Sequence, residues 1–180
     1  MLEITIPAIE QWDELKEEFI SSKEQKLLLE HSLISISKWE SNWKKPYLSK
    51  EPKTKAETLD YIKCMTVSKN VKPEVYSFLT NENIEQILAY IGDSMTATRL
   101  PENKSGKGSG EQITSELVYY WMTQWNIPPE YQKWHFSRLI TLIQICNIKN
   151  QPAKKMSKSE IMQRNASINA ARRKKFNTRG

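Results

Sequence analysis

The chain has few of the residues on which metal and redox sites depend. Among its 180 residues there are two cysteines, two histidines and five glycines. Cys64 and Cys146 each stand alone in an apolar segment, so we expect reduced structural thiols and no disulfide. A zinc site would need both to converge with His31 and His135, whereas zinc ligands usually occur in closely spaced pairs. The composition therefore predicts a protein without a metal or cofactor.

Segments that enter or cross membranes are also missing. No run of about 18 apolar residues occurs. The first ten residues, MLEITIPAIE, have neither the basic start nor the apolar body of a signal peptide. We therefore expect no membrane association and a location in the cytoplasm.

Motifs that would indicate an enzyme are not found. The segment GKGSG lacks the GK[ST] ending and the preceding apolar strand of a phosphate-binding loop. His135 lies one turn from Arg138 and Leu139 in an apolar helical pattern, which favours a structural histidine over a catalytic one. We predict that the protein is not an enzyme.

Positive charge is concentrated at the C-terminus. The whole chain has 27 basic and 21 acidic residues, a net charge of +6. Residues 149–180 hold ten basic residues and one acid, a charge of +9, which leaves −3 for residues 1–148. We expect a mainly helical globular domain over residues 1–150 and a basic, loosely held helical tail over residues 151–180.

The first hundred residues predict both strands and helices. Residues 2–8 alternate apolar and polar positions like a strand, and the strand formers of residues 26–36 predict a second strand paired with it. Residues 95–100 are expected to return to this sheet as a further strand. Around Trp12, Leu15 and Phe19 we expect a short helix or a loop. A helical turn is predicted over residues 75–79, after Pro73.

Helix starts are marked by capping residues. A capping box, in which Ser or Thr precedes Glu by three positions, opens three predicted helices: at Ser37 and Glu40, at Thr54 and Glu57, and at Ser157 and Glu160. A further helix is predicted from a cap at Asn81 to a left-handed stop at Gly92. Its inward face is expected to hold four residues: Ile84, Ile87, Leu88 and Ile91.

Residues 111–150 predict two apolar helices that fold back on each other at Pro128 and Pro129. The stripe expected at helical spacing comprises Ile113, Leu117, Tyr120, Trp121 and Trp125 in the first arm, and Tyr131, Trp134, Leu139, Leu142, Ile143 and Cys146 in the second. These rings form either a core or a groove that binds an amphipathic helix of another protein. The candidate anchors for such a partner are Trp121, Trp125, Tyr131 and Trp134.

The tail offers a second candidate interface. A helix is predicted from about residue 158 to 175, and its apolar stripe of Ile161, Ile168 and Ala171 is too thin to bury by itself. Its cations would steer an acidic protein partner or bind the phosphates of a nucleic acid. The candidate residues are Lys154, Lys155, Arg172, Arg173, Lys174 and Lys175.

Taken together, the patterns predict a mainly α fold with a small N-terminal β-sheet (α+β), a C-terminal helical hairpin and a basic helical tail.

The run PPEYQKWHFSRLITLIQICNIKNQPAKKMSKSEIMQRNASINAARRKK resembles the C-terminal half of small proteins encoded in the tail modules of long-tailed bacteriophages and prophages of Gram-positive bacteria. The segments SISKWESNWKKPYL and LDYIKCMT resemble their N-terminal part. These proteins are similar to tail assembly chaperones.

The resemblance implies a role in tail morphogenesis. Such a protein would coat the long apolar helices of the tape measure protein while tail tube subunits assemble around it. Two alternatives stay open: a virion structural or head-to-tail joining protein, and a regulator that binds nucleic acid through the basic tail. A homo-oligomer is compatible with each of these roles.

Overall fold

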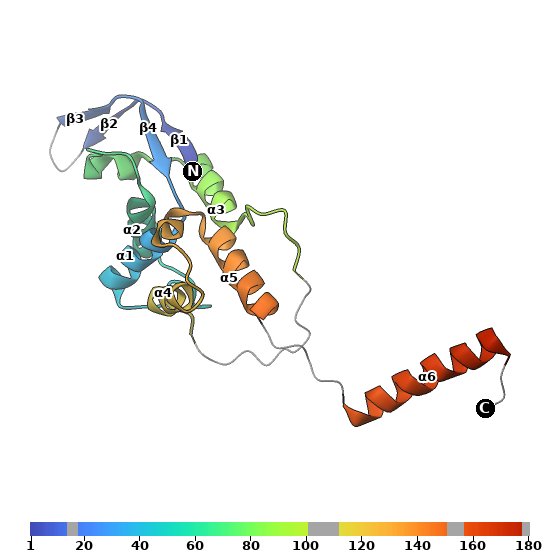
Figure 1. Cartoon of the computed structure of the whole chain (residues 1–180). Helices are drawn as coiled ribbons and strands as arrows, with labels where there is room; N and C mark the ends of the chain where they lie inside the picture. Colours follow the sequence, from blue (N-terminus) through green and yellow to red (C-terminus); the bar gives the residue numbers. More distant parts are fainter. Residues whose placement is uncertain (14–17, 101–111, 151–156, 178–180) are drawn as a thin grey trace. The chain divides into compact units, whose positions relative to one another are not determined.

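The structure, a computed structural model, describes residues 1–13, 18–100, 112–150 and 157–177, and for 9–13 and 18–22 it describes the backbone. Over these residues the strands come first in the chain and the helices follow (Figure 1). The fold is mainly helical with a small N-terminal antiparallel sheet, as the sequence predicted. The chain divides into two compact units, residues 1–146 and 147–180, which are described separately.

Four strands near the N-terminus pair in two antiparallel ladders. Their bounds are β1 Leu2–Ile6, β2 Ile9–Asp13, β3 Glu18–Ser22 and β4 Gln25–Leu29. β1 pairs with β4, and β2 pairs with β3. The predicted pairing of the first strand with a strand that starts near residue 26 is therefore confirmed.

Both ladders belong to one long hairpin that is interrupted at Pro7. Ile6 lies opposite Gln25 in the first ladder and Ile9 lies opposite Ser22 in the second, so the register is continuous. Proline has no N–H to donate to a ladder, which accounts for the break.

The prediction of a short helix or a loop around Trp12, Leu15 and Phe19 is wrong at the two residues that the structure describes. Trp12 and Phe19 lie opposite each other in the ladder between β2 and β3. Leu15 lies outside the described residues. Aromatic residues favour strands, and a hairpin places them at opposed positions.

The strand predicted over residues 26–36 ends sooner, because a helix begins within it. α1 spans Leu33–Trp43, and Ser32 is its N-cap. The hydroxyl of Ser32 accepts the N–H of Ser35, and the Ser35 hydroxyl accepts the N–H of Ser32, which makes a reciprocal capping box. The box expected at Ser37 and Glu40 is wrong.

Glu40 does not cap α1 but accepts hydrogen bonds from two other segments. Its carboxylate is buried and accepts the backbone N–H of Tyr47 at 2.8 Å and that of Ser115 at 2.8 Å. It thereby ties the segment after α1 to the start of a later helix. Charge-assisted hydrogen bonds of this kind are among the stronger ones in proteins.

The next two helical elements follow the predictions closely. α2 spans Lys55–Met65 and begins with the predicted capping box of Thr54 and Glu57. η1, a 3-10 helix over Pro73–Phe78, covers most of the predicted turn. The end of α2 reaches the outer edge of β4, where the Val67 N–H donates to the Leu28 carbonyl at 2.8 Å.

α3 spans Asn81–Gly92, but its ends differ from the prediction. The N-cap is Thr80 and not Asn81, and it forms a capping box with Asn83. Gly92 is the last helical residue, and the extended Asp93 caps the helix, so no left-handed glycine ends it. The strand expected over residues 95–100 is absent from this described segment.

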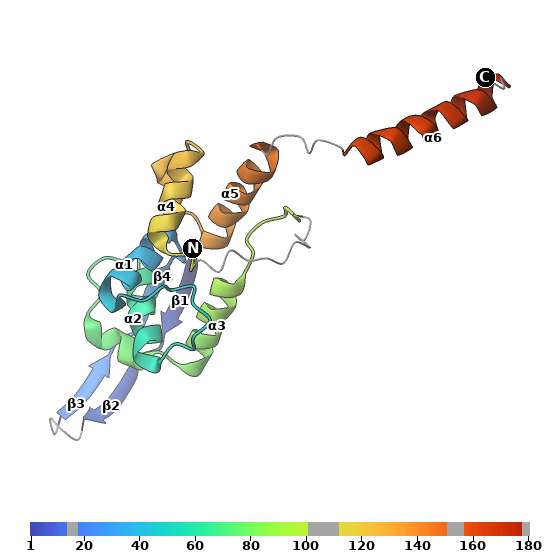
Figure 2. The ribbon, with the colours of Figure 1, turned by 90° about the horizontal axis from the view of Figure 1, so that it is seen from below.

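α4 spans Ser115–Gln124, and η2, a 3-10 helix over Pro129–Lys133, leads to α5, Phe136–Asn150. α4 and α5 are neighbours in both views (Figures 1 and 2), and η2 connects them. α4 packs mainly against α1. α5 begins five residues later than expected, because His135 pairs with Ser32 in a β-bridge before the helix starts.

The buried face of α4 is rotated from the predicted stripe. Ser115, Val118 and Met122 are buried, whereas Ile113 is 39% exposed and Tyr120 is 60% exposed. The hydrogen bond from Ser115 to Glu40 fixes this rotation. In α5 the prediction holds better, since Leu139 and Ile143 are buried.

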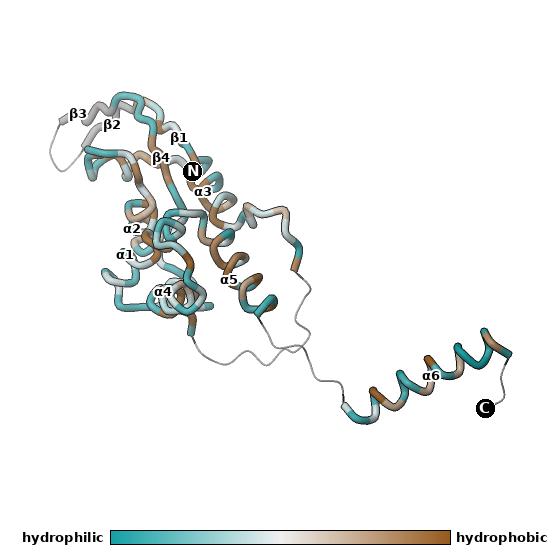
Figure 3. The backbone as a smooth tube through the Cα atoms, in the orientation of Figure 1, coloured by the Kyte–Doolittle hydropathy of each residue, from teal (hydrophilic) through white to brown (hydrophobic). Residues whose placement is uncertain are grey.

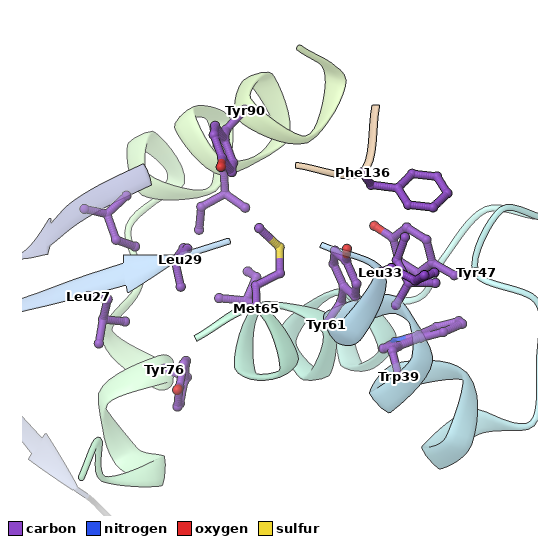
Figure 4. Close-up of a cluster of buried hydrophobic side chains, with 14 of the residues drawn as sticks. Leu27, Leu29, Leu33, Trp39, Tyr47, Tyr61, Met65, Tyr76, Tyr90 and Phe136 are labelled. Carbon is purple, nitrogen blue, oxygen red and sulfur yellow. The ribbon is translucent and has the colours of Figure 1, made fainter. Parts of the chain in front are cut away.

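The core lies between the β1–β4 ladder and the helices. Figure 4 shows Trp39, Tyr47, Tyr61 and Phe136 gathered at one end, and Leu27 with Tyr76 at the other. The Trp39 indole N–H donates to the Glu57 carbonyl at 2.9 Å, which satisfies the polar atom of a nearly fully buried ring.

The second unit contains α6, which spans Lys158–Phe176. Ser157 and Glu160 form the predicted capping box, and the left-handed Asn177 ends the helix. None of its residues is buried. Hydrophilic and hydrophobic residues follow one another along its length (Figure 3). That residues 1–150 fold without this helix stays a prediction.

Candidate functional site

The four predicted aromatic anchors lie on α4 and on the segment that joins it to α5. Trp121 lies on α4, and Trp125, one turn later, caps the end of that helix; both are half-buried. Both pack against the core, as does Tyr131 of η2. Trp121, Trp125 and Tyr131 thus contribute to the core and keep an accessible part, and their role as a binding surface stays a prediction.

Tyr131 and Trp134 form a stacked pair in this group. Their rings stack with centroids 4.0 Å apart and an interplanar angle of 15°. The Arg138 guanidinium lies 4.2 Å from the centroid of the Trp134 ring, which is a favourable cation–π distance. On α4, the Tyr119 hydroxyl donates to the Gln132 side chain at 3.0 Å and holds η2 against the helix.

We call Trp121, Trp125, Tyr131 and Trp134 the aromatic surface. Half-buried, well-fixed aromatic rings are typical of interface anchors, because they lose little conformational freedom on binding. Three indole rings and one phenol ring make up this surface. What it can do chemically is bury apolar groups of a partner.

The predicted cations of the tail are in part described. Four of them lie at the end of α6: Arg172 just before its last turn, and Arg173, Lys174 and Lys175 within it. We call these the basic turn. They are exposed, and their position at the helix C-terminus suits the helix dipole. Lys154 and Lys155 lie outside the described residues.

Sequence reasoning missed a buried polar cluster around the two histidines. The rings of His31 and His135 lie with centroids 5.0 Å apart, although the residues come from opposite ends of the domain. His31 Nδ1 and the Tyr61 hydroxyl share a hydrogen bond. His135 Nε2 donates to the Tyr90 carbonyl at 3.0 Å. No local motif could have indicated this contact.

The cluster keeps His31 uncharged. Burial lowers the pKa of His31 to about 3, and the neighbouring His135 adds to the shift. His135 Nδ1 is buried without a hydrogen-bond partner among the described residues. These environments fit the predicted structural histidine.

The fold also shifts the pKa values of two further titratable groups, Glu57 and Cys64. A hydrogen bond from Lys45 is the main reason why the pKa of Glu57 falls to about 2. Burial raises the pKa of the Cys64 thiol to about 11. Cys64 and Cys146 are both half-buried.

Within the described residues, no group of three or more His, Cys, Asp or Glu side chains is placed to hold a metal ion. None of the described helices is both long enough and apolar enough to cross a membrane.

No family model, curated protein or solved structure matches this chain.

Proposed function

We propose that this protein is a non-enzymatic assembly factor of long-tailed bacteriophages or prophages. It binds the tape measure protein and tail tube subunits in the host cytoplasm, in the manner of a tail assembly chaperone. The proposal joins the sequence resemblance to the surfaces described above, and its central observation is the state of α6.

α6 is a long helix with strong signals at both ends and no buried face. Ser157 caps its start and Asn177 ends it, yet Ile161 is 44% exposed and Met162 is 73% exposed. An isolated helix of this length is marginally stable in water, because most helical stability in proteins comes from packing. A partner that covers these apolar residues would supply that packing, so α6 is suited to fold fully when it binds.

The body of the protein would act together with this helix. The aromatic surface offers half-buried rings that can shield an exposed apolar face of a long helical protein. The basic turn would attract an acidic partner and speed the first encounter. Coating of this kind prevents aggregation and needs no catalytic residue.

A nucleic-acid regulator is the second candidate, and the basic turn is the observation that favours it. Four consecutive cations can neutralise phosphates, and binding of that kind weakens steeply as salt rises. Base recognition in single strands relies on stacking of the bases on aromatic rings. α6 offers one such ring, Phe176, beside these cations.

The test measures binding of the full-length protein to a recombinant tape measure fragment. The binding variant replaces all four residues of the basic turn with Gln. A matched control replaces four exposed lysines of the body with Gln: Lys50, Lys55, Lys69 and Lys72. At low salt the binding variant should associate at least roughly tenfold more slowly, whereas the control should associate like the parent.

Two results would contradict the proposal. One is a tape measure fragment that fails to bind the parent protein. The other is loss of DNA or RNA binding in the basic-turn variant while binding to the tape measure fragment is unchanged, which would favour the regulator. Detection of the protein in purified virions would favour the virion structural alternative.

A further inference from the structure

α3 carries two apolar faces, and only one of them is covered. Ile87 and Tyr90 face the core and are buried. Ile84, Leu88 and Ile91 follow each other at spacings of four and three residues, and we call them the α3 ridge. Leu88 is 53% exposed, and the other two are half-buried. The sequence predicted that Ile84, Ile87, Leu88 and Ile91 face inward, which is wrong for Leu88, whereas Ile91 packs partly against the core.

The α3 ridge lines a cleft of about 370 Å³ between α2, α3 and the segment of residues 47–53. We call it the α2–α3 cleft. Tyr47 and Tyr61 also line it, and their rings stack with centroids 4.0 Å apart. The volume lies within the range of about 300–1,000 Å³ that is usual for pockets that bury a ligand. The cleft therefore has room for large apolar side chains.

A cation lies beside these apolar walls. Lys53 lines the cleft, and its ammonium stands 4.3 Å from the centroid of the Tyr47 ring and 5.8 Å from that of the Trp39 ring. No ion pair among the described residues uses Lys53, because the nearby Glu57 is paired with Lys45 at 2.9 Å. Burial lowers the pKa of Lys53 and the charge of Glu57 partly opposes this, so a further carboxylate beside the ammonium would favour its charged form.

Glu51 is the acidic residue of the cleft lining, and it is exposed. The negative charge of Glu51 helps to raise the pKa of Lys45. Among the described residues, Glu51 forms no direct ion pair with Lys53. A basic helix such as α6, from this chain or a second copy, would bring like charges to Lys53. Lys53 is the basic residue of the lining, so a carboxylate of the occupant that lies beside it is favoured.

We propose that the α2–α3 cleft binds an amphipathic helix of a partner protein, with apolar side chains of that helix packed on the α3 ridge and a flanking carboxylate paired with Lys53. This inference rests on the proposed function, which supplies a partner with exposed apolar helical faces. The ridge has the spacing at which one helix packs against another, and helix-in-groove recognition uses anchors at the same spacing.

The experiment uses the full-length protein and two synthetic amphipathic helical peptides. Both peptides have the same leucine stripe, and one has Glu where the other has Gln beside that stripe. Binding is followed by NMR of isoleucine methyl groups. We expect the methyl signals of Ile84 and Ile91 to shift and the Glu peptide to bind several-fold more tightly.

Two variants and their controls locate the site. Lys53→Gln should remove the preference for the Glu peptide, and Lys55→Gln, an exposed neighbour outside the cleft, should keep it. Leu88→Ser should weaken both peptides by roughly tenfold, since a buried leucine contributes at least that much. Leu48→Ser, which changes an exposed leucine outside the cleft, should not.

Several outcomes would overturn the inference. They are failure of both peptides to bind, unshifted Ile84 and Ile91 methyl groups, and an intact Glu preference in Lys53→Gln. Peptide binding that shifts only signals of α6 would also overturn it, because the contact would then be at the basic turn. Loss of the cleft site leaves the tape measure test of α6 standing, so the two proposals fail independently.

Discussion

Lowering the pH from 7 to 5 should destabilise the protein through His31. In the folded state burial holds the pKa of this histidine at about 3, whereas an ordinary histidine has a pKa of 6.5. Above pH 6.5 both the folded and the unfolded chain hold a neutral His31, so its contribution does not vary. Below pH 6.5 the unfolded chain takes up a proton that the folded chain excludes. Stability is therefore lost as the pH falls from 6.5 toward 3.

The size of the effect follows from the shift. One pKa unit corresponds to about 1.4 kcal/mol, so the free energy of unfolding should fall by roughly 2 kcal/mol at pH 5 and by up to about 5 kcal/mol near pH 3. Between pH 6.5 and 5 the change in the free energy of unfolding reports on the histidines. The pKa of Glu57 is lowered, so the stability that this carboxylate contributes is lost only below its ordinary pKa of 4.5. The chain has only one other histidine, His135.

The assay is urea unfolding of the full-length protein followed by tryptophan fluorescence between pH 7 and 5. The matched variant is His31→Asn, whose side-chain oxygen can still accept the Tyr61 hydroxyl. It should be less stable at pH 7 but should show a flatter dependence on pH. A parent protein equally stable at pH 7 and 5, or a variant with the same slope as the parent, would refute the reasoning.

Three further changes test the packing and the caps. Leu139→Ala removes a fully buried side chain and should cost on the order of 2–5 kcal/mol in thermal or urea unfolding, and Leu142→Ala, at a half-buried position, should cost less. Glu40→Ala leaves two backbone N–H groups without an acceptor and should cost roughly 2–5 kcal/mol, and Glu40→Gln should restore only part of the loss, because its single side-chain oxygen can accept one of the two N–H groups. Ser157→Ala should weaken α6 by about 1 kcal/mol, seen as reduced helical circular dichroism with an unchanged melting temperature of the body.

Local signals in the sequence predicted the elements whose ends are fixed by neighbouring residues. The capping boxes at Thr54 and Ser157 are of this kind, since each closes within three positions. The start of α1 was missed because its box pairs Ser32 with another serine and not with Glu. Glu40 was misassigned because its partner Ser115 lies 75 positions away.

The candidate site was predictable to a similar degree. Residue type and spacing identified the aromatic surface and the basic turn, but not how far each ring is buried. The α3 ridge could not be found this way, since Leu88 has the same helical spacing as a core residue. Whether an apolar face is covered depends on the packing of distant segments. The contact between His31 and His135 depends on the same long-range packing.

The most direct test of the central claim compares the full chain with a chain cut after Asn150, by calorimetric titration with a tape measure fragment. α6 has no buried residue, so the shorter chain should melt at nearly the same temperature. It should bind the fragment more weakly, and the remaining affinity should depend less on salt. Equal affinity and equal salt dependence in the two chains would contradict the role of α6, and unfolding of the shorter chain would show that the helix belongs to the core.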